Sequence, residues 1–297
     1  MDNKILGSYV NGDYTVTIYG DGTKIRENDL DCLTPDKPES IDLKITNRCD
    51  MNCPMCHEDS TPDGADADLS NLAFLDTLSP YTEIAIGGGN PLEHPYLVWF
   101  LQELKRKNLI ANITVNQRHF IRDQSLIRYL VDNDLIHGVG VSVMKPDEDL
   151  ICLLRTYPNA VVHVINGMID PAILKPMCDK KLKLLILGYK NFRRGKAYHS
   201  QTVENLKYRM YFKLPKIIKH FAVTSFDNLA VSQLEVRRLM SNKRWDEFYM
   251  GDDGQYTMYI DAVKREFAKS SVSPERHPLT DDIKFMFNCI RGNEWID

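Results

Sequence analysis

Short apolar runs of strand length alternate with stretches of helical periodicity from about residue 40 onward. The expected strands are residues 41–45, 83–86, 111–115, 138–143, 160–165 and 182–187. The expected helices are residues 71–78, 96–107, 123–133, 147–155 and 171–178. Strands that alternate with helices pair in parallel, because each helix carries the chain back across the sheet. Six such units predict an α/β fold, a partial (β/α)6 TIM-like barrel, with its chemistry at the carboxyl ends of the strands.

The two ends of the chain carry a different pattern. Residues 8–26 alternate apolar and polar positions around Asn-Gly and Asp-Gly turn pairs, which predicts a small antiparallel β meander. After about residue 220 the strand-helix alternation stops, and residues 248–260 are typical of a β-hairpin. We therefore expect an N-terminal β meander with a linker, a barrel core and a C-terminal α+β extension, at residues 1–39, 40–220 and 221–297.

The composition is that of an ordinary globular protein, with 43% of the 297 residues apolar and 26% charged. No apolar run approaches the length of a membrane span, and the N-terminus lacks a basic-then-apolar signal pattern. Seven cysteines, an odd number, argue against a disulfide framework and for reduced thiols. We therefore expect a cytoplasmic protein with no membrane partner.

Charge is spread unevenly along the chain. The formal net charge is −4, yet residues 175–219 hold thirteen Lys or Arg against two acidic residues. Such a local excess attracts phosphate or carboxylate groups, although solvated helix faces produce the same pattern.

Three cysteines, Cys49, Cys53 and Cys56, follow the first expected strand of the core. Thiolates this close on one loop can bind a single inorganic centre. A structural zinc site uses four protein ligands, and His57 is a candidate for the fourth. Three thiolates on a four-iron cluster instead leave one iron open to another ligand. The number of cysteines therefore favours a catalytic iron-sulfur cluster.

The spacing Cys-x3-Cys-x2-Cys, on the loop after the first strand, resembles the signature of the radical S-adenosylmethionine superfamily. The resemblance implies that these cysteines bind one 4Fe-4S cluster, whose free iron chelates S-adenosylmethionine. Reduction then releases a 5′-deoxyadenosyl radical that abstracts hydrogen from a substrate. The residue before the third cysteine is commonly aromatic in that family, and here it is Met55. Its thioether can still pack against an adenine ring.

A second segment, Gly88-Gly89-Asn90-Pro91, resembles the Gly-Gly-Glu-Pro motif of the same family. In that family the motif contacts the methionyl amino group of S-adenosylmethionine. The sequence departs from the motif at Asn90, whose carbonyl oxygen can accept from an ammonium but brings no negative charge.

A third segment, His163-x-Ile165-x-Gly167-x-x-Asp170, resembles the family pattern Gly-x-Ile-x-Gly-x-x-Glu, which packs on adenine. It falls on the fifth expected strand, as the resemblance requires. Other polar residues at strand ends are expected to meet the ribose, the methionyl carboxylate or the adenine. These candidates are Asn116, Ser142 and Tyr189.

The four remaining cysteines, Cys32, Cys152, Cys178 and Cys289, are scattered. They lack the clustering of an auxiliary-cluster (SPASM) domain, so one cluster is expected. The catalytic residues are otherwise unknown. Cys289 and Cys178 are weak candidates for a hydrogen donor, and burial among apolar residues explains each of them more simply.

The leading hypothesis is a radical S-adenosylmethionine enzyme that acts on a peptide or ribosomally made precursor, because the terminal β segments offer sheet edges for a chain to join. An electron donor such as flavodoxin or ferredoxin is the expected second partner. The alternative is modification of a nucleotide, nucleic acid or other anionic metabolite, motivated by the basic stretch. A second alternative is a non-catalytic iron-sulfur or zinc-binding protein.

Overall fold

A computed structural model describes residues 4–30 and 32–292. Its N-terminal part is a three-stranded antiparallel sheet, which confirms the predicted meander. The strands are β1 (Ile5–Asn11), β2 (Tyr14–Tyr19) and β3 (Lys24–Glu27). Alternate residues of β2 are buried and form a small core beneath this sheet.

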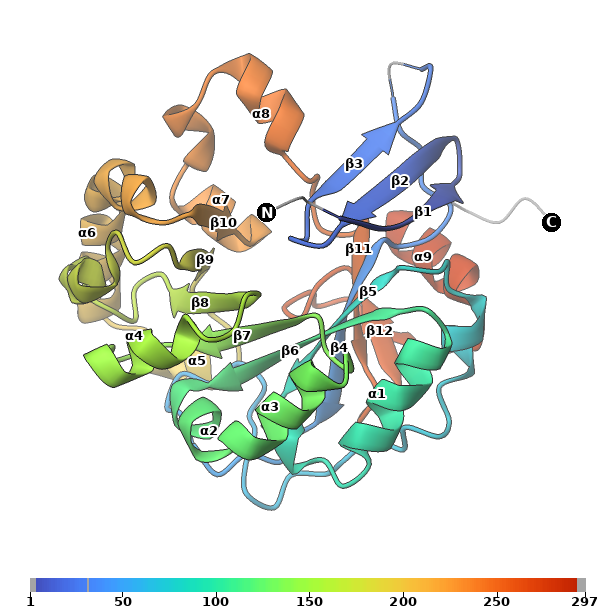
Figure 1. Cartoon of the computed structure of the whole chain (residues 1–297), viewed down its shortest axis with the longest axis horizontal. Coiled ribbons are helices and arrows are strands. Elements are labelled where there is room, and N and C mark those ends of the chain that lie inside the picture. The colour runs from blue at the N-terminus through green and yellow to red at the C-terminus, as the bar shows by residue number, and fades with distance from the viewer. Residues whose placement is uncertain (1–3, 31, 293–297) are drawn as a thin grey trace.

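A ten-stranded sheet forms the body of the molecule, in the order β10-β9-β8-β7-β6-β5-β4-β11-β12-β13 (Figure 1). The strands are β4 (Ser40–Thr46), β5 (Glu83–Gly88), β6 (Ile110–Asn116), β7 (Gly138–Ser142), β8 (Ala160–Ile165), β9 (Lys183–Leu187), β10 (Val223–Phe226), β11 (Thr257–Asp261), β12 (Glu266–Ala268) and β13 (His277–Pro278). Strands β4 to β10 pair in parallel with their neighbours, and β11 pairs in parallel with β4. All six predicted strands and their parallel pairing are therefore confirmed.

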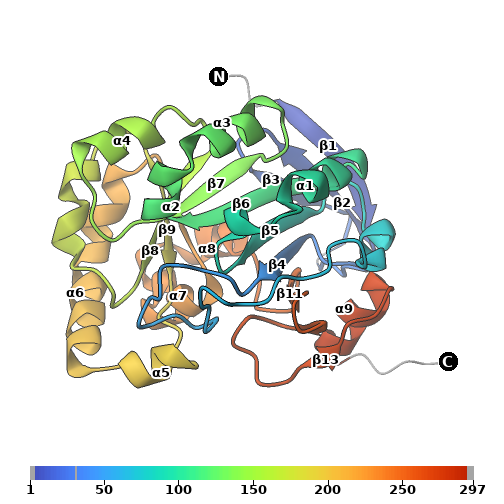
Figure 2. The same cartoon turned by 90° about the horizontal axis from the view of Figure 1, so that it is seen from below.

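Helices cover the outer face of this sheet (Figure 2). The α-helices are α1 (Leu97–Arg106), α2 (Gln117–Arg122), α3 (Gln124–Asp132), α4 (Glu148–Leu154), α5 (Arg194–Tyr198), α6 (Gln201–Ile217), α7 (Asn228–Gln233), α8 (Asn242–Phe248) and α9 (Ile283–Arg291). Short 3-10 helices are η1 (Ala73–Thr77), η2 (Pro91–Glu93), η3 (Pro171–Met177), η4 (Ile218–His220) and η5 (Val236–Leu239). Because side chains alternate along a strand, Ile41, Leu43 and Ile45 of β4 are buried in the main core, while Asp42 and Lys44 point to the inner face.

The predicted C-terminal hairpin at residues 248–260 is wrong. Residues 249–256 form no strand, and β11 pairs instead with β4 on one side and with β12 on the other. The buried positions of β11 explain the difference, because its apolar run is covered on both sides as an inner strand of the large sheet.

The strand-helix alternation also continues beyond residue 220, contrary to the prediction. Strand β10 adds a seventh parallel strand beside β9, and α7 follows it. Its four residues include two hydroxyl side chains, so the local hydrophobic signal is weak. Within residues 4–30 and 32–292 the large sheet ends at β10 and at β13 and does not close.

The helices in the described part of the chain include none that is both long and apolar enough to span a bilayer.

Candidate functional site

The predicted site residues follow the carboxyl ends of six neighbouring parallel strands, which lie at one edge of the sheet. They are Cys49, Cys53, Met55 and Cys56 after β4; Gly88, Gly89, Asn90 and Pro91 at the end of β5; Asn116 on β6; Ser142 on β7; Ile165 and Gly167 at the end of β8; and Tyr189 after β9. The parallel topology therefore gathers residues that are up to 140 positions apart in the chain.

The cysteine loop, residues 47–66, is closed at its base by hydrogen bonds. The Thr46 hydroxyl donates to Asp66 Oδ1 at 2.6 Å, and the Arg48 guanidinium donates to Asp66 Oδ2 at 2.6 Å. The backbone N–H of Cys49 donates to the carbonyl of Thr61 at 2.8 Å. The loop thus has a defined conformation although it contains little regular secondary structure.

All three cysteines of this loop are free and half-buried. Burial, together with the smaller effect of the nearby Cys53 and Cys56, raises the pKa of the Cys49 thiol to about 11. Burial, and then the charge of Cys56, also raises the pKa of Cys53. Three thiols of this kind on one loop fit a cluster that keeps one iron free of protein ligands.

Two glycines at the end of β5 let this segment lie against the start of the cysteine loop. The N–H of Gly89 donates to the carbonyl of Thr46 at 2.8 Å, and the N–H of Asn90 donates to that of Arg48 at 2.7 Å. A Cβ on Gly89 would lie 2.1 Å from the Arg48 carbonyl oxygen, and Gly88 has a φ of +109°. No side chain fits at either position, so the glycines serve a close approach of two backbones.

Asn90 is fully buried at the turn into η2. Its Oδ1 accepts from the N–H of Leu92 at 3.3 Å, and its Nδ2 donates to Glu93 Oε1 at 3.1 Å. The side chain therefore caps η2. An amide oxygen has a second lone pair, so this role leaves acceptor capacity.

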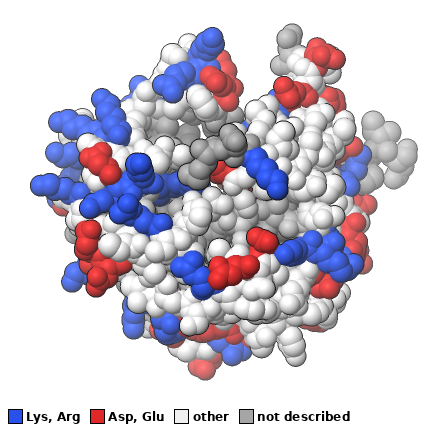
Figure 3. Space-filling view, in the orientation of Figure 1, with Lys and Arg blue, Asp and Glu red and all other residues white. Residues whose placement is uncertain are grey.

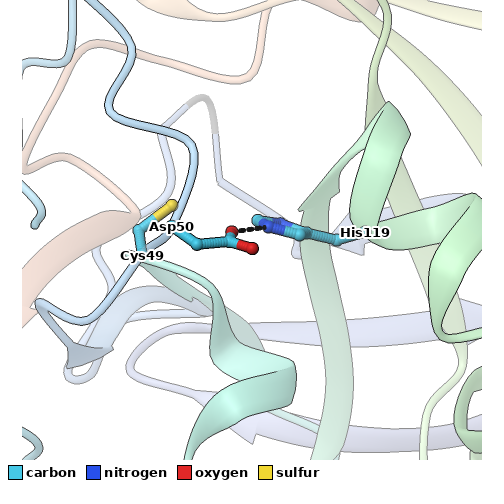
Figure 4. A group of neighbouring side chains, drawn as sticks. All are labelled: Cys49, Asp50 and His119. Carbon is cyan, nitrogen blue, oxygen red and sulfur yellow. Dashed lines mark hydrogen bonds and ion pairs between the residues drawn. The ribbon is translucent and has the colours of Figure 1, made fainter. Parts of the chain in front are cut away.

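An acidic residue within the cysteine loop is bound by two side chains from α2. His119 Nε2 lies 2.5 Å from Asp50 Oδ1, and Arg122 donates to Asp50 Oδ2 at 2.7 Å. The hydrogen bond with His119 is the main cause that lowers the pKa of Asp50. Figure 4 shows the Asp50 carboxylate directed at the imidazole, with Cys49 beside it. Sequence analysis missed this pairing, because nothing in the local sequence links Asp50 to a residue 69 positions later.

A small pocket of about 50 Å³ lies where the cysteine loop meets the ends of β8 and β9. Met55 and His57 line it from the loop, Ile165 from β8, and Leu187, Tyr189 and Lys190 from β9 and the residues after it. Three residues predicted to contact adenine, Met55, Ile165 and Tyr189, are thus brought together. The Tyr189 hydroxyl is held by a 2.6 Å hydrogen bond to the carbonyl of Gly195.

Asn116, Ser142 and His163 form a row across the inner face of three strands, since Ser142 is the register partner of both others. Asn116 Oδ1 accepts from the N–H of Arg118 and caps α2. His163 is 9% exposed, and its ring occupies the space above Gly140, where a Cβ would lie 2.1 Å from the imidazole. Burial lowers the pKa of His163 to about 4, so the ring is neutral at pH 7. His163 was not predicted as a site residue from the sequence, where it stands at the first glycine position of the Gly-x-Ile-x-Gly-x-x-Glu pattern.

Gly167 lies apart from this row, against Val203 and Lys207 of α6, with a φ of +88°. Cys178 precedes β9 and Cys289 lies on α9, whose last residue, Arg291, donates to the carbonyl of Pro35 before β4. Both thiols are therefore near the amino ends of the strands, at the opposite edge from the cysteine loop.

A buried ionic cluster lies below the pocket. Lys44 Nζ is 2.9 Å from Glu58 Oε2 and 3.2 Å from Asp261 Oδ2, and all three side chains are at most 7% exposed. Burial acts to raise the pKa of Glu58, but the hydrogen bonds and charges of His57 and Lys44 outweigh it and hold that pKa below its usual range. His57 Nε2 also lies 3.1 Å from Lys190 Nζ. This nitrogen of His57 is therefore engaged with Glu58 and Lys190, which disfavours it as a zinc ligand.

No family model matches the chain. Among curated proteins, the PqqA peptide cyclase of Gluconobacter oxydans is 27% identical over 84 residues, which cover 27% of this chain and 24% of that protein. The chain thus matches about a quarter of the length of this relative.

Solved structures give broader matches. Streptococcus suis SuiB bound to S-adenosylmethionine superposes with a TM-score of 0.61 at 11% identity, covering 94% of this chain and 85% of that one. SuiB bound to its precursor peptide SuiA has a TM-score of 0.56 at 13% identity, covering 82% and 63%. The chain therefore has the fold of SuiB.

Proposed function

We propose that this protein is a radical S-adenosylmethionine enzyme that modifies a peptide. The observation that carries the proposal is the position of three half-buried thiols on one loop, beside a pocket lined by Met55, Ile165 and Tyr189. The SuiB structures, one with S-adenosylmethionine and one with a precursor peptide, and the PqqA peptide cyclase support the same reading.

Each predicted residue has a role in this proposal. Cys49, Cys53 and Cys56 hold the 4Fe-4S cluster. When bound, the cluster supplies the electron that cleaves S-adenosylmethionine to a 5′-deoxyadenosyl radical, which abstracts hydrogen from the peptide. The pocket residues hold the adenine, and the other residues orient the methionyl group and the ribose. These other residues are Gly88, Gly89, Asn90, Pro91, Asn116, Ser142 and Gly167.

The large sheet, in this proposal, curls into a partial barrel around the substrate. Six strand spacings separate β4 from β10, roughly 29 Å in a flat sheet at 4.8 Å per spacing. Yet the charges of Lys190, after β9, and of Asp227, after β10, act on Asp42 in β4. Loss of hydration among the surrounding protein atoms is the main cause that raises the pKa of Asp42 to about 6, although part of this side chain is exposed to water. The action of these distant charges on Asp42 and its partial loss of hydration both support a concave inner face.

The remaining expectations belong to the same proposal. An electron donor such as flavodoxin or ferredoxin reduces the cluster, and the reducing cytoplasm keeps the seven thiols free. The division into residues 1–39, 40–220 and 221–297 is retained as a proposal about folding units. In the structure β11, from the last of them, is an integral strand of the large sheet.

The first experiment tests the chemistry. The full chain is reconstituted anaerobically with iron and sulfide, given S-adenosylmethionine and dithionite, and assayed for 5′-deoxyadenosine. We expect about four irons per chain and product formation. Cys53→Ala should lose both, whereas Cys152→Ala, which removes an exposed thiol on α4, should keep both. A loaded wild-type protein that forms no 5′-deoxyadenosine contradicts the proposal, and uptake of one zinc with a gain in stability supports the structural alternative.

The second experiment tests the substrate class. Short reading frames encoded beside the gene are co-expressed with the enzyme, and each peptide is examined by mass spectrometry. A mass change that depends on Cys53 supports a peptide substrate. Modification of an anionic metabolite, suggested by the basic stretch, predicts no such change and substrate binding that weakens steeply with salt.

A further inference from the structure

An open groove of about 530 Å³ runs along α6 beside α7. Its wall on α6 includes Tyr208 and Phe212, which are 67% and 58% exposed, and their ring centroids lie 4.5 Å apart. Phe212 also contacts Tyr211, with centroids 5.2 Å apart. Two exposed aromatic rings beside a third, partly buried one form an apolar patch on this helix, and such patches mark sites of interaction.

The groove adjoins the strand-end pocket. Gln233 lines the groove, its Oε1 accepts from the N–H of Tyr189 at 2.9 Å, and its Nε2 donates to the carbonyl of Tyr189 at 2.9 Å. Tyr189 in turn lines the pocket beside Met55. One pair of hydrogen-bonded residues therefore separates the two spaces, so an extended chain in the groove is held next to the pocket.

The electrostatics of the groove indicate the charge of its ligand. Helix α6 carries four cations and one carboxylate, Glu204, which is paired with Lys207 and His199. In the described part of the chain, two cations near the rings, Lys216 of α6 and Arg238 of η5, have no carboxylate partner. Figure 3 shows Lys and Arg gathered on the side of the molecule where Figure 1 places α6.

The position of these cations relative to the rings completes the site. The Arg238 guanidinium lies 3.7 Å from the centroid of the Tyr211 ring. Lys216 is four residues beyond Phe212 and so lies on the same face of α6. Acidic groups on a ligand therefore meet cations at the margin of the groove while its apolar groups meet the rings.

The polar residues of the groove favour a polypeptide over a nucleic acid. Gln201 Nε2 donates to Asn205 Oδ1 at 3.1 Å, which leaves the Gln201 carbonyl oxygen and the Asn205 amide nitrogen to match the donors and acceptors of a peptide backbone. Glu204 within the groove repels a continuous line of phosphates, which a nucleic acid would bring.

We propose that the groove between α6 and α7 binds an acidic segment, with apolar side chains, of the peptide that the enzyme modifies. This rests on the proposed peptide-modifying function. It assigns the groove the task of holding the substrate beside the adenine pocket, so that a neighbouring segment of the peptide reaches the strand-end site for reaction.

Binding is tested with a short fluorescein-labelled peptide of Glu, Leu and Phe, and a matched peptide with Lys in place of Glu. Fluorescence anisotropy with the full chain should show binding of the acidic peptide that weakens with salt, and weaker binding of the basic one. Tyr208→Ser with Phe212→Ser should weaken binding about tenfold, and Lys216→Glu should also weaken it and reduce its salt dependence. Tyr129→Ser, a matched control at an exposed ring on α3, should bind as wild type.

The proposal is overturned if the two peptides bind equally, if the acidic peptide does not bind, or if the aromatic double variant binds as tightly as wild type. It is also overturned if a single-stranded oligonucleotide binds more tightly than the acidic peptide. 5′-Deoxyadenosine formation without peptide is measured in parallel. Normal formation with no peptide binding rejects the groove alone, whereas its absence in loaded wild-type protein rejects the proposed chemistry.

Discussion

Gly89 shows how a single atom limits the approach of two backbones at the site. A Cβ at this position would lie 2.1 Å from the Arg48 carbonyl oxygen, whereas a Cβ on Gly87 in the same strand would have no atom within 4 Å. Gly89→Ala should therefore cost about 1–3 kcal/mol and displace the cysteine loop. Gly87→Ala should leave stability unchanged. Urea denaturation of the iron-free protein and iron content after reconstitution measure the two effects. Equal behaviour of the two variants contradicts this account.

His163 makes stability depend on pH. Its folded-state pKa of about 4 lies below the ordinary histidine value of 6.5, so the buried ring resists protonation. The stability that this ring contributes is present above pH 6.5 and is lost as the pH falls from 6.5 to 4. The full loss is about 3 kcal/mol.

Urea denaturation of wild type and His163→Gln between pH 7.5 and 4.5 measures this loss. The variant should show a smaller decrease with falling pH than wild type. His220→Gln, at an exposed histidine, is the control and should follow wild type. A His163→Gln curve parallel to that of wild type would count against the assignment.

The cysteine loop is an element held by its base rather than by regular hydrogen bonding. Asp66→Ala removes the partner of the fully buried Thr46 hydroxyl and of Arg48. We expect a loss of about 1–3 kcal/mol, faster proteolysis between residues 47 and 66, and poorer retention of iron. Limited proteolysis and iron analysis provide the measurement. Asp63→Ala, at an exposed position of the same loop, should behave as wild type.

Sequence reasoning succeeded for elements whose signal is local. The six parallel strands and the N-terminal meander were expected because apolar runs and turn pairs mark them within a few residues. It failed for β10 and β11, whose neighbours are decided by the large sheet. The residues of β11 were interpreted as half of a hairpin, since a turn signal near residue 252 precedes them. In the structure β11 pairs with β4, over two hundred residues earlier.

At the scale of the whole molecule, Lys44 links three parts of the chain. It comes from β4 and contacts Glu58 of the cysteine loop and Asp261 at the end of β11. Lys44→Ala leaves the buried Asp261 carboxylate without its cation and Glu58 with Arg193 at 3.5 Å, and it should cost about 3–5 kcal/mol. The control is Lys284→Ala, which breaks a half-exposed pair with Asp36 and should cost at most about 1 kcal/mol.

Urea denaturation of the two variants measures this difference. A triple variant, Lys44→Met with Glu58→Gln and Asp261→Asn, should recover part of the loss because no uncompensated charge remains. Equal losses in the two single variants would mean that the buried cluster contributes no more than a surface pair.

The sequence by itself determined the three-thiol motif, the glycine pair that follows the second core strand, and the parallel α/β character of the chain. These depend on covalent spacing and on periodicity over a few residues. Only the tertiary structure decided that Met55 meets Ile165 and Tyr189, that Asp50 meets His119, and that an aromatic, basic groove adjoins the pocket through Gln233. Such contacts join residues far apart in the chain, and they arise from the order and curvature of the strands, which no local pattern encodes.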